Sequence, residues 1–174
     1  YISPHIMDIR ERIQIDGEPI SPAEFASAIS KIKKVVGNRP KEYATFFEIL
    51  TASAFWLFAE KKVDTAVIEC GLGGKYDATN VVNPEIAIIT RIGLDHTDRL
   101  GETISQIAED KANIIKGNSI AIVGMQEQDA ILPIRRRIQH VNAKSFIWGE
   151  HFSHSVKKSD LNGSEIVQKI GDHN

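Results

Sequence analysis

Apolar positions along the chain gather in short, β-branched runs that are separated by longer helical patterns. Four runs are of the kind that buried parallel strands show: residues 64–70 (DTAVIEC), 85–92 (EIAIITRI), 118–124 (NSIAIVG) and 143–149 (AKSFIWG). Helical patterns fill residues 103–116 and 127–141, and Pro133 either starts or kinks the second. This alternation predicts an α/β fold with an open, mostly parallel sheet flanked by helices and right-handed crossovers.

The amino-terminal part predicts one more strand and two more helices. Residues 9–15 (IRERIQI) alternate apolar and charged, which predicts a half-exposed strand. Ser21 as N-cap, a proline directly after it and Glu24 as the capping-box partner start a helix over residues 22–36. Residues 45–60 are apolar nearly all round, so this helix is expected to be buried on more than one side.

Composition narrows the class of protein. The chain has 174 residues, of which 42% are hydrophobic and 25% charged, as expected for one compact domain or a part of one. The net charge of −2 gives no electrostatic case for nucleic acid or an anionic membrane, and the basic cluster 135–137 fits a solvated helix face better than an anion site. The lone Cys70 suits a small core residue and a reducing compartment, and no signal or membrane-spanning pattern occurs, so a cytoplasmic location is expected.

Residues 69–80 (ECGLGGKYDATN) contain three glycines and a lysine directly after the first strand-like run. A phosphate-binding loop needs Ser or Thr after its Gly-Lys pair, where Tyr76 stands, and glycine where Glu69 stands. The dinucleotide pattern G-x-G-x-x-G fails at Tyr76 as well. Two interpretations stay open from the residues alone: a tight turn with solvated acids, or a ligand site that uses Glu69 and Asp77 at a strand's carboxyl end.

The next strand-like run delivers a second polar group to the same edge of the predicted sheet. Residues 93–98 (GLDHTD) place His96 and two carboxylates after it. Together with Glu69, His96 forms a plausible site for a divalent metal; oxygen ligands suit Mg²⁺, whereas a His nitrogen is a less usual ligand for it. Lys111 lies on a predicted helix, where the pattern alone indicates a surface lysine.

Five motifs, kept in order and spacing, resemble the folylpolyglutamate synthase and dihydrofolate synthase family of the Mur ligase superfamily. They are SPH at 3–5, TFFE at 45–48, VIECGLGGKYDATNVV at 67–82, ITRIGLDHTDRLG at 89–101 and IAEDKANIIKG at 107–117. The resemblance implies a central, P-loop-NTPase-like domain of a ligase. In this chemistry, ATP activates the carboxylate of dihydropteroate or a folate as an acyl phosphate, and the amino group of glutamate attacks it to form an amide. Mg²⁺ is the implied cofactor and ATP the co-substrate.

The resemblance also assigns roles residue by residue. Ser3, Glu69 and His96 match the magnesium ligands, and His96 is counted with the catalytic residues. Lys111 matches a lysine that CO₂ carbamylates, which requires a neutral amine. An aromatic ring that stacks on the pterin and an acid that bonds its edge make chemical sense, although Phe47 on helical spacing alone fits a core residue. The substrate-binding positions are Thr45, Phe46, Phe47, Glu48, Tyr76, Asp77 and Ala78.

The family's phosphate-binding loop lies upstream of SPH, and its smaller carboxyl-terminal domain lies beyond the similar region. Because the chain begins at Tyr1, on strand-like sequence, we expect an upstream part to be missing. Residues 1–150 are then a partial central domain and residues 151–174 a weakly patterned tail that starts a truncated region. The expected function is that of a ligase fragment, inactive alone, from a family that is usually monomeric. The alternatives are a non-catalytic folate- or pterin-binding module, or another Mur-type amide ligase, which TFFE and YDATN disfavour.

Overall fold

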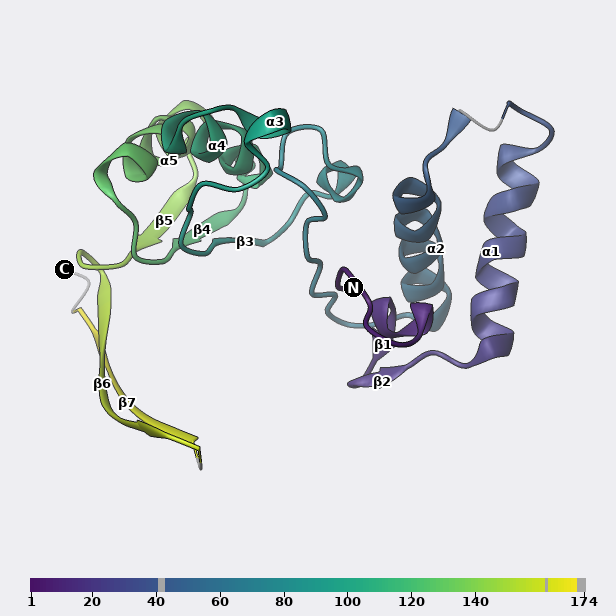
Figure 1. The fold of residues 1–174 in the computed structure, drawn as a ribbon, viewed down its shortest axis with the longest axis horizontal. Helices are drawn as coiled ribbons and strands as arrows, with labels where there is room; N and C mark the ends of the chain where they lie inside the picture. Colours follow the sequence, from purple (N-terminus) through teal and green to yellow (C-terminus); the bar gives the residue numbers. More distant parts are fainter. Residues whose placement is uncertain (41–42, 162, 172–174) are drawn as a thin grey trace. The chain divides into compact units, whose positions relative to one another are not determined.

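The computed structural model describes residues 1–40, 43–161 and 163–171 (Figure 1). The chain falls into two compact units, and each is described by itself. The first unit comprises residues 1–72 and 76–81, and the second comprises residues 73–75 and the chain from Val82 onward. Four positions of the predicted tail, residues 162 and 172–174, lie outside the described residues.

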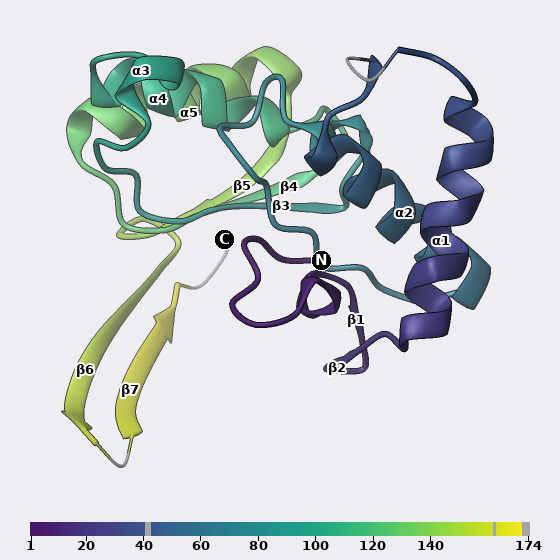
Figure 2. The same cartoon turned by 45° about the vertical axis from the view of Figure 1, so that its right-hand side comes forward.

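The first unit is mainly a pair of helices beside a small hairpin (Figure 1). Its elements are η1 (Ile9–Arg12), β1 (Gln14–Ile15), β2 (Glu18–Pro19), α1 (Pro22–Val36), α2 (Phe46–Lys61) and η3 (Ala78–Val81). The two helices lie side by side in Figures 1 and 2. The helix predicted over residues 22–36 is confirmed, including the capping box between Ser21 and Glu24.

The strand predicted over residues 9–15 is wrong for most of its length. A 3₁₀ turn, Ile9–Arg12, takes its place, and only the last two predicted residues form a strand. Asp8 caps this turn, accepting a hydrogen bond from the amide two residues on (2.8 Å). The carboxylate of Glu11 accepts from the amides of residues 6, 7 and 8 at 2.6–2.9 Å. These local hydrogen bonds offer the backbone an alternative to a strand, and they win over the alternating pattern.

Helix α2 is the centre of the first unit's core. From Ile49 to Phe58 every residue is buried or half-buried, which confirms the prediction of burial on more than one side. Three of its own residues, Ala54, Leu57 and Phe58, form a buried apolar cluster with Tyr1, Ile13 and Ile20. None of the helices in the described ranges combines the length and the apolar character that a bilayer crossing requires.

Residues 64–70 do not form the predicted buried strand. Within the described residues, the backbone hydrogen bonds of this segment join it to Tyr1: the Tyr1 ammonium donates to the Val67 carbonyl (2.8 Å) and the Glu69 amide donates to the Tyr1 carbonyl (2.9 Å). Two hydrogen bonds to one residue do not make a ladder. The side chain of Val67 is accordingly 81% exposed.

The second unit is built on a parallel sheet of three strands in the order β3-β4-β5, which confirms the predicted fold class. Its elements are β3 (Ile86–Ile89), α3 (Thr97–Leu100), α4 (Ile104–Lys111), η4 (Ala112–Ile114), β4 (Ile120–Val123), α5 (Gln128–Val141) and β5 (Lys144–Ile147). Helices α4 and α5 cover one face of the sheet (Figures 1 and 2). Helix α5 runs through Pro133, so this proline does not start it. On the other face, Ile86 and Ile88 are 52% and 60% exposed.

An antiparallel ribbon follows this sheet, where the sequence predicts no element. It consists of β6 (Phe152–Asp160) and β7 (Gly163–Ile170), in a register that pairs Phe152 with Ile170. Most of its described residues are exposed, so the ribbon adds little to the core of the second unit.

Candidate functional site

Residues 71–80, the glycine loop, are held by two carboxylates, and the first binds the beginning of the loop. Asp77 Oδ2 accepts hydrogen bonds from the amides of Gly71 (2.9 Å) and Leu72 (2.8 Å). Asp77 Oδ1 accepts from the amide of Thr79 (2.9 Å) and also from its hydroxyl. This predicted substrate-binding acid therefore also orders the loop in which it lies.

A second carboxylate, Asp110, binds the other half of the loop. Its Oδ1 accepts from the amides of Gly74 (2.8 Å) and Lys75 (3.3 Å). A Cβ atom on Gly74 would lie 2.8 Å from the Lys111 carbonyl oxygen, so the loop needs glycine to reach the end of α4. The half-buried Lys111, the last residue of α4, thus lies directly under the glycine loop.

Sequence reasoning missed Asp110. One signal was available, because an acid in the last turn of a helix lies at the negative end of the helix dipole. Such a residue needs a partner elsewhere, and here the partners are loop amides. Four amides of the glycine loop donate hydrogen bonds to carboxylates, namely those of Gly71, Leu72, Gly74 and Lys75. The backbone of this loop therefore binds acidic side chains of the same chain.

The structure brings two of the predicted magnesium ligands together. The Ser3 amide donates to Glu69 Oε2 (2.8 Å), which joins segments 66 positions apart. Ser3 is half-buried and Glu69 is exposed. A hydroxyl and a carboxylate are oxygen donors of the kind that Mg²⁺ prefers, so these two residues fit the implied ion.

The third predicted ligand, His96, belongs to the second unit. It is the N-cap of α3 and adopts a left-handed conformation with φ 48°. Its amide donates to Asp95 Oδ1 (2.8 Å), and its side chain is 55% exposed. Non-glycine residues with such a φ are uncommon and concentrate at functional positions. Within the described residues no three His, Cys, Asp or Glu side chains gather as a metal-binding group by themselves.

Thr45 and Glu48 form the capping box of α2. The Thr45 amide donates to Glu48 Oε2 (2.6 Å), and the Glu48 amide donates to Thr45 Oγ1 (3.2 Å). The hydrogen bond from the Thr45 backbone, followed by that from its hydroxyl, lowers the pKa of Glu48. Both residues therefore fix the start of α2, and contact with a substrate stays a prediction for them.

The two phenylalanines that open α2 have different environments. Phe46 is 58% exposed, and its ring centroid lies 5.6 Å from the guanidinium carbon of Arg12. Phe47 packs against the core, with its ring 6.0 Å from that of Tyr1. A Cβ on Gly71 would lie 2.8 Å from Phe47 Cε1, so the glycine loop also packs on this ring. Phe47 thus packs against the core, and its contact with a substrate stays a prediction, whereas Phe46 presents the more open aromatic surface.

The residues on either side of Asp77 also differ in exposure. The side chain of Tyr76 is 85% exposed. Ala78 is half-buried and is the first residue of η3. Of the predicted substrate-binding positions in this loop, Tyr76 thus offers the largest open surface.

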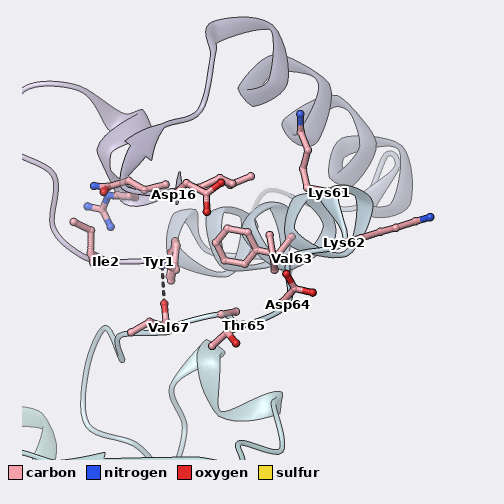
Figure 3. Close-up of a pocket in the computed structure, with 14 residues that line it drawn as sticks. Tyr1, Ile2, Asp16, Lys61, Lys62, Val63, Asp64, Thr65 and Val67 are labelled. Atoms are coloured by element: carbon pink, nitrogen blue, oxygen red, sulfur yellow. Dashed lines mark hydrogen bonds between the residues drawn. The ribbon is translucent and has the colours of Figure 1, made fainter.

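A cavity of about 620 Å³ in the first unit lies at the amino-terminal end of the chain (Figure 3). Tyr1 and Val67, joined by the hydrogen bond drawn in Figure 3, form part of its wall, together with β1 and the end of α2. Arg12 also lines it. Among the described residues that line this cavity, none is a predicted metal or substrate position.

Comparison with known proteins identifies the class. Residues 23–170 match the family of the Mur ligase middle domain. The chain is 36% identical over 167 residues to folylpolyglutamate synthase of Lacticaseibacillus casei, covering 94% of this chain and 39% of that protein. It is 42% identical over 143 residues to the dihydrofolate synthase/folylpolyglutamate synthase of Bacillus subtilis (strain 168), covering 80% of this chain and 33% of that protein. A solved complex of FPGS with AMPPCP and folate superposes with a TM-score of 0.84 at 34% identity, over 94% of this chain and 43% of that one.

The fold and the matching residues are those of a Mur ligase middle domain. Within that class, the chain belongs to the folylpolyglutamate synthase and dihydrofolate synthase family. The resemblance seen in the five motifs is thereby confirmed. The roles of individual residues stay predictions.

Proposed function

We propose that this chain supplies the middle domain of an ATP-dependent ligase that adds L-glutamate to dihydropteroate or a folate. The observation that carries the proposal is the hydrogen bond between Ser3 and Glu69. Glu69 precedes the glycine loop, whose amides bind Asp77. The chain spans 39% of the Lacticaseibacillus casei relative. We therefore propose that other parts of the protein complete the ATP site, and that residues 1–174 alone do not catalyse the reaction. We retain residues 1–150 as the middle-domain portion and residues 151–174 as a tail, and we expect a cytoplasmic monomer.

The proposed reaction has two transfers. A carboxylate oxygen of the pterin-bearing substrate attacks the γ-phosphorus of ATP, which forms an acyl phosphate and releases ADP. The glutamate amine then attacks the acyl carbon, loses a proton, forms the amide bond and releases inorganic phosphate. Positioning and electrostatic stabilisation of the transferring group supply most of the rate enhancement in such reactions.

In this proposal Ser3 and Glu69 hold Mg²⁺ through oxygen atoms, with His96 as the further ligand. When bound, the ion neutralises charge that builds up on the phosphate oxygens. The hydrogen bond from the Ser3 amide orients the Glu69 carboxylate. Lys111 is the proposed site of carbamylation, which would turn a cation into an oxygen-bearing anion; an intact-mass measurement in bicarbonate buffer, compared with the same chain carrying Lys111→Arg, tests it.

The substrate end of the site is held by local hydrogen bonds. The capping box of Thr45 and Glu48 fixes the first turn of α2, from which the exposed ring of Phe46 projects. Asp77 fixes the turn that presents Tyr76. We propose that the rings of these two residues stack on the flat pterin-bearing substrate, because stacked aromatic rings attract each other and the Tyr76 hydroxyl can stay in water.

A graft tests the proposed function. The matching segment of the Lacticaseibacillus casei synthase is replaced with this chain, and the incorporation of labelled glutamate into folate is measured with ATP present. The graft is expected to be active, and Glu69→Gln in the graft is expected to abolish incorporation. The matched control is Glu60→Gln, on an exposed glutamate of the same unit, which is expected to keep activity. A graft in which Glu69→Gln is as active as Glu60→Gln would refute the proposal.

A further inference from the structure

Arg12 is a buried cation. It is 8% exposed, although arginine is rarely buried without a charged partner. Its Nε donates to His5 Nδ1 (2.8 Å), and its guanidinium lies 5.6 Å from the centroid of the Phe46 ring. Its backbone carbonyl accepts from the Ile2 amide (3.0 Å), which fixes the main chain at this position.

Neither of two side chains that contact the Arg12 guanidinium, His5 and Phe46, supplies a negative charge. A histidine nitrogen that accepts a hydrogen bond carries no proton, so Nδ1 of His5 brings no negative charge. The Phe46 ring contributes a cation–π contact and no more. Within residues 1–40, 43–161 and 163–171, no carboxylate forms an ion pair with Arg12. A buried charge without a counter-ion is costly, so this site favours an anion.

The surroundings of Arg12 connect it to the proposed substrate site. The charge of Arg12 acts on the Tyr1 phenol. Burial raises the pKa of this phenol most strongly, the hydrogen bond from Thr51 and the charge of Arg12 lower it, and the charge of Asp77 raises it. Arg12 and Asp77 therefore act on the same hydroxyl group within the first unit. Arg12 also lines the cavity of Figure 3, which gives a small ligand access to it.

We propose that Arg12 binds the carboxylate of the pterin-bearing substrate. The inference rests on the proposed function, which supplies a flat aromatic ligand with an acid group. The planar guanidinium can donate two parallel hydrogen bonds to a carboxylate, a geometry that lysine cannot reproduce. The bound carboxylate supplies the missing counter-charge, and the cation–π contact with Phe46 holds the guanidinium plane in position.

The test uses the full chain, residues 1–174, and two ligands that differ at one group: dihydropteroate, with a carboxylate, and its carboxamide, which is neutral and has one acceptor oxygen instead of two. Calorimetric titration of the unsubstituted chain is expected to show tighter binding of the acid than of the amide. Arg12→Gln is expected to weaken binding of the acid by about 10- to 100-fold, the usual size of a hydrogen bond to a charged group. Binding of the amide is expected to change by less than about threefold. Arg39→Gln, which removes an exposed arginine lying 4.4 Å from the Tyr43 ring, is the matched control and should change neither.

Arg12→Lys covers the case in which Arg12→Gln fails to fold by circular dichroism, because it keeps the charge. It should bind the acid more weakly than the unsubstituted chain does, with the affinity for the amide unchanged. Equal weakening of acid and amide in either variant would overturn the proposal, since it would indicate a packing role. Equal affinity of the unsubstituted chain for both ligands, or no binding of either, would overturn it too. Glutamate incorporation by the graft reports on the proposed function separately, so the two can fail independently.

Discussion

Replacing Gly74 with alanine should lower the free energy of unfolding by more than one added methyl group suggests, because the atoms nearest to the added Cβ belong to the backbone. An added Cβ would lie 2.8 Å from the Lys111 carbonyl oxygen, 2.9 Å from the Asp110 carbonyl oxygen and 3.0 Å from Lys111 Cα. Backbone at the end of a helix cannot turn away as a side chain can. Overpacking of this kind costs about 1–3 kcal/mol. Displacing the loop also strains the 2.8 Å hydrogen bond from the Gly74 amide to the Asp110 carboxylate, and such a bond contributes about 1.5–3 kcal/mol.

Gly74→Ala should therefore lower the free energy of unfolding by about 3 kcal/mol, which corresponds to about 6–12 °C in Tm for a chain of this length. Gly93→Ala is the matched control in the same unit, because no atom lies within 4 Å of its added Cβ and its φ is not left-handed. It should change stability by no more than about 0.5 kcal/mol. Urea unfolding followed by circular dichroism measures both, and hydrogen exchange over residues 104–111 tests the second unit by itself. Equal stability of the two variants would refute the close approach of the loop to α4.

Three further predictions concern groups with a single structural role. Asp110→Ala should speed hydrogen exchange at the Gly74 amide and cost about 1.5–3 kcal/mol, whereas Asp110→Asn, which keeps an acceptor oxygen, should cost less; equal exchange in both would contradict a role for the oxygen. The hydrogen bond from Lys61 is the main cause that lowers the pKa of Glu24 to about 2, so the ionised Glu24 stabilises the fold above pH 4.5 and progressively less as the pH falls toward 2. In urea titrations, the difference in unfolding free energy between the unsubstituted chain and Glu24→Gln should shrink over this pH range. A difference that stays constant would contradict the lowered pKa of Glu24. Thr45→Ala should lower the free energy of unfolding by about 1 kcal/mol, and Thr45→Ser should leave it almost unchanged. Equal losses in both variants would contradict the capping of α2 by the hydroxyl.

Elements that depend on near neighbours in the chain could be predicted from the sequence. The helix begun by Ser21 and Glu24 needs only residues within one turn, and it has the expected bounds. The three parallel strands were also predictable, because β-branched runs such as residues 118–124 are long and apolar enough to indicate burial. The turn at residues 9–12 has a local signal too, since Asp8 and Glu11 have capping-box spacing, but the alternating polarity of the same residues indicates a strand.

Features that depend on distant partners could not be predicted in this way. Residues 64–70 have the composition of a buried strand, yet a strand forms only where neighbours supply a ladder. The β6–β7 ribbon is polar on most of its surface, so its pattern was too weak to identify, although the Asn-Gly pair at 162–163 is a hairpin signal. The burial of Arg12 follows from packing around it and cannot be read from an alternating run.

Within the site, motif and geometry contribute different information. The motifs identified the family and matched Ser3 and Glu69 with its magnesium ligands, and the structure brings these two residues together. They said nothing of Asp110 as a partner of the glycine loop, because that contact joins positions 36 apart in the chain. Polar groups that bind the backbone of a remote segment leave no periodic signal.

The acids bound to the glycine loop also limit how the loop could be redesigned. Tyr76→Thr would bring the sequence closer to a phosphate-binding loop, yet an incoming phosphate would meet Asp77 and Asp110 already seated on the amides. Two carboxylates repel a phosphate by charge and also occupy the donors that it needs. Both acids would therefore have to be replaced before a nucleotide could bind. The free energy of unfolding lost with them would have to be smaller than the binding free energy of the nucleotide for the loop to stay ordered.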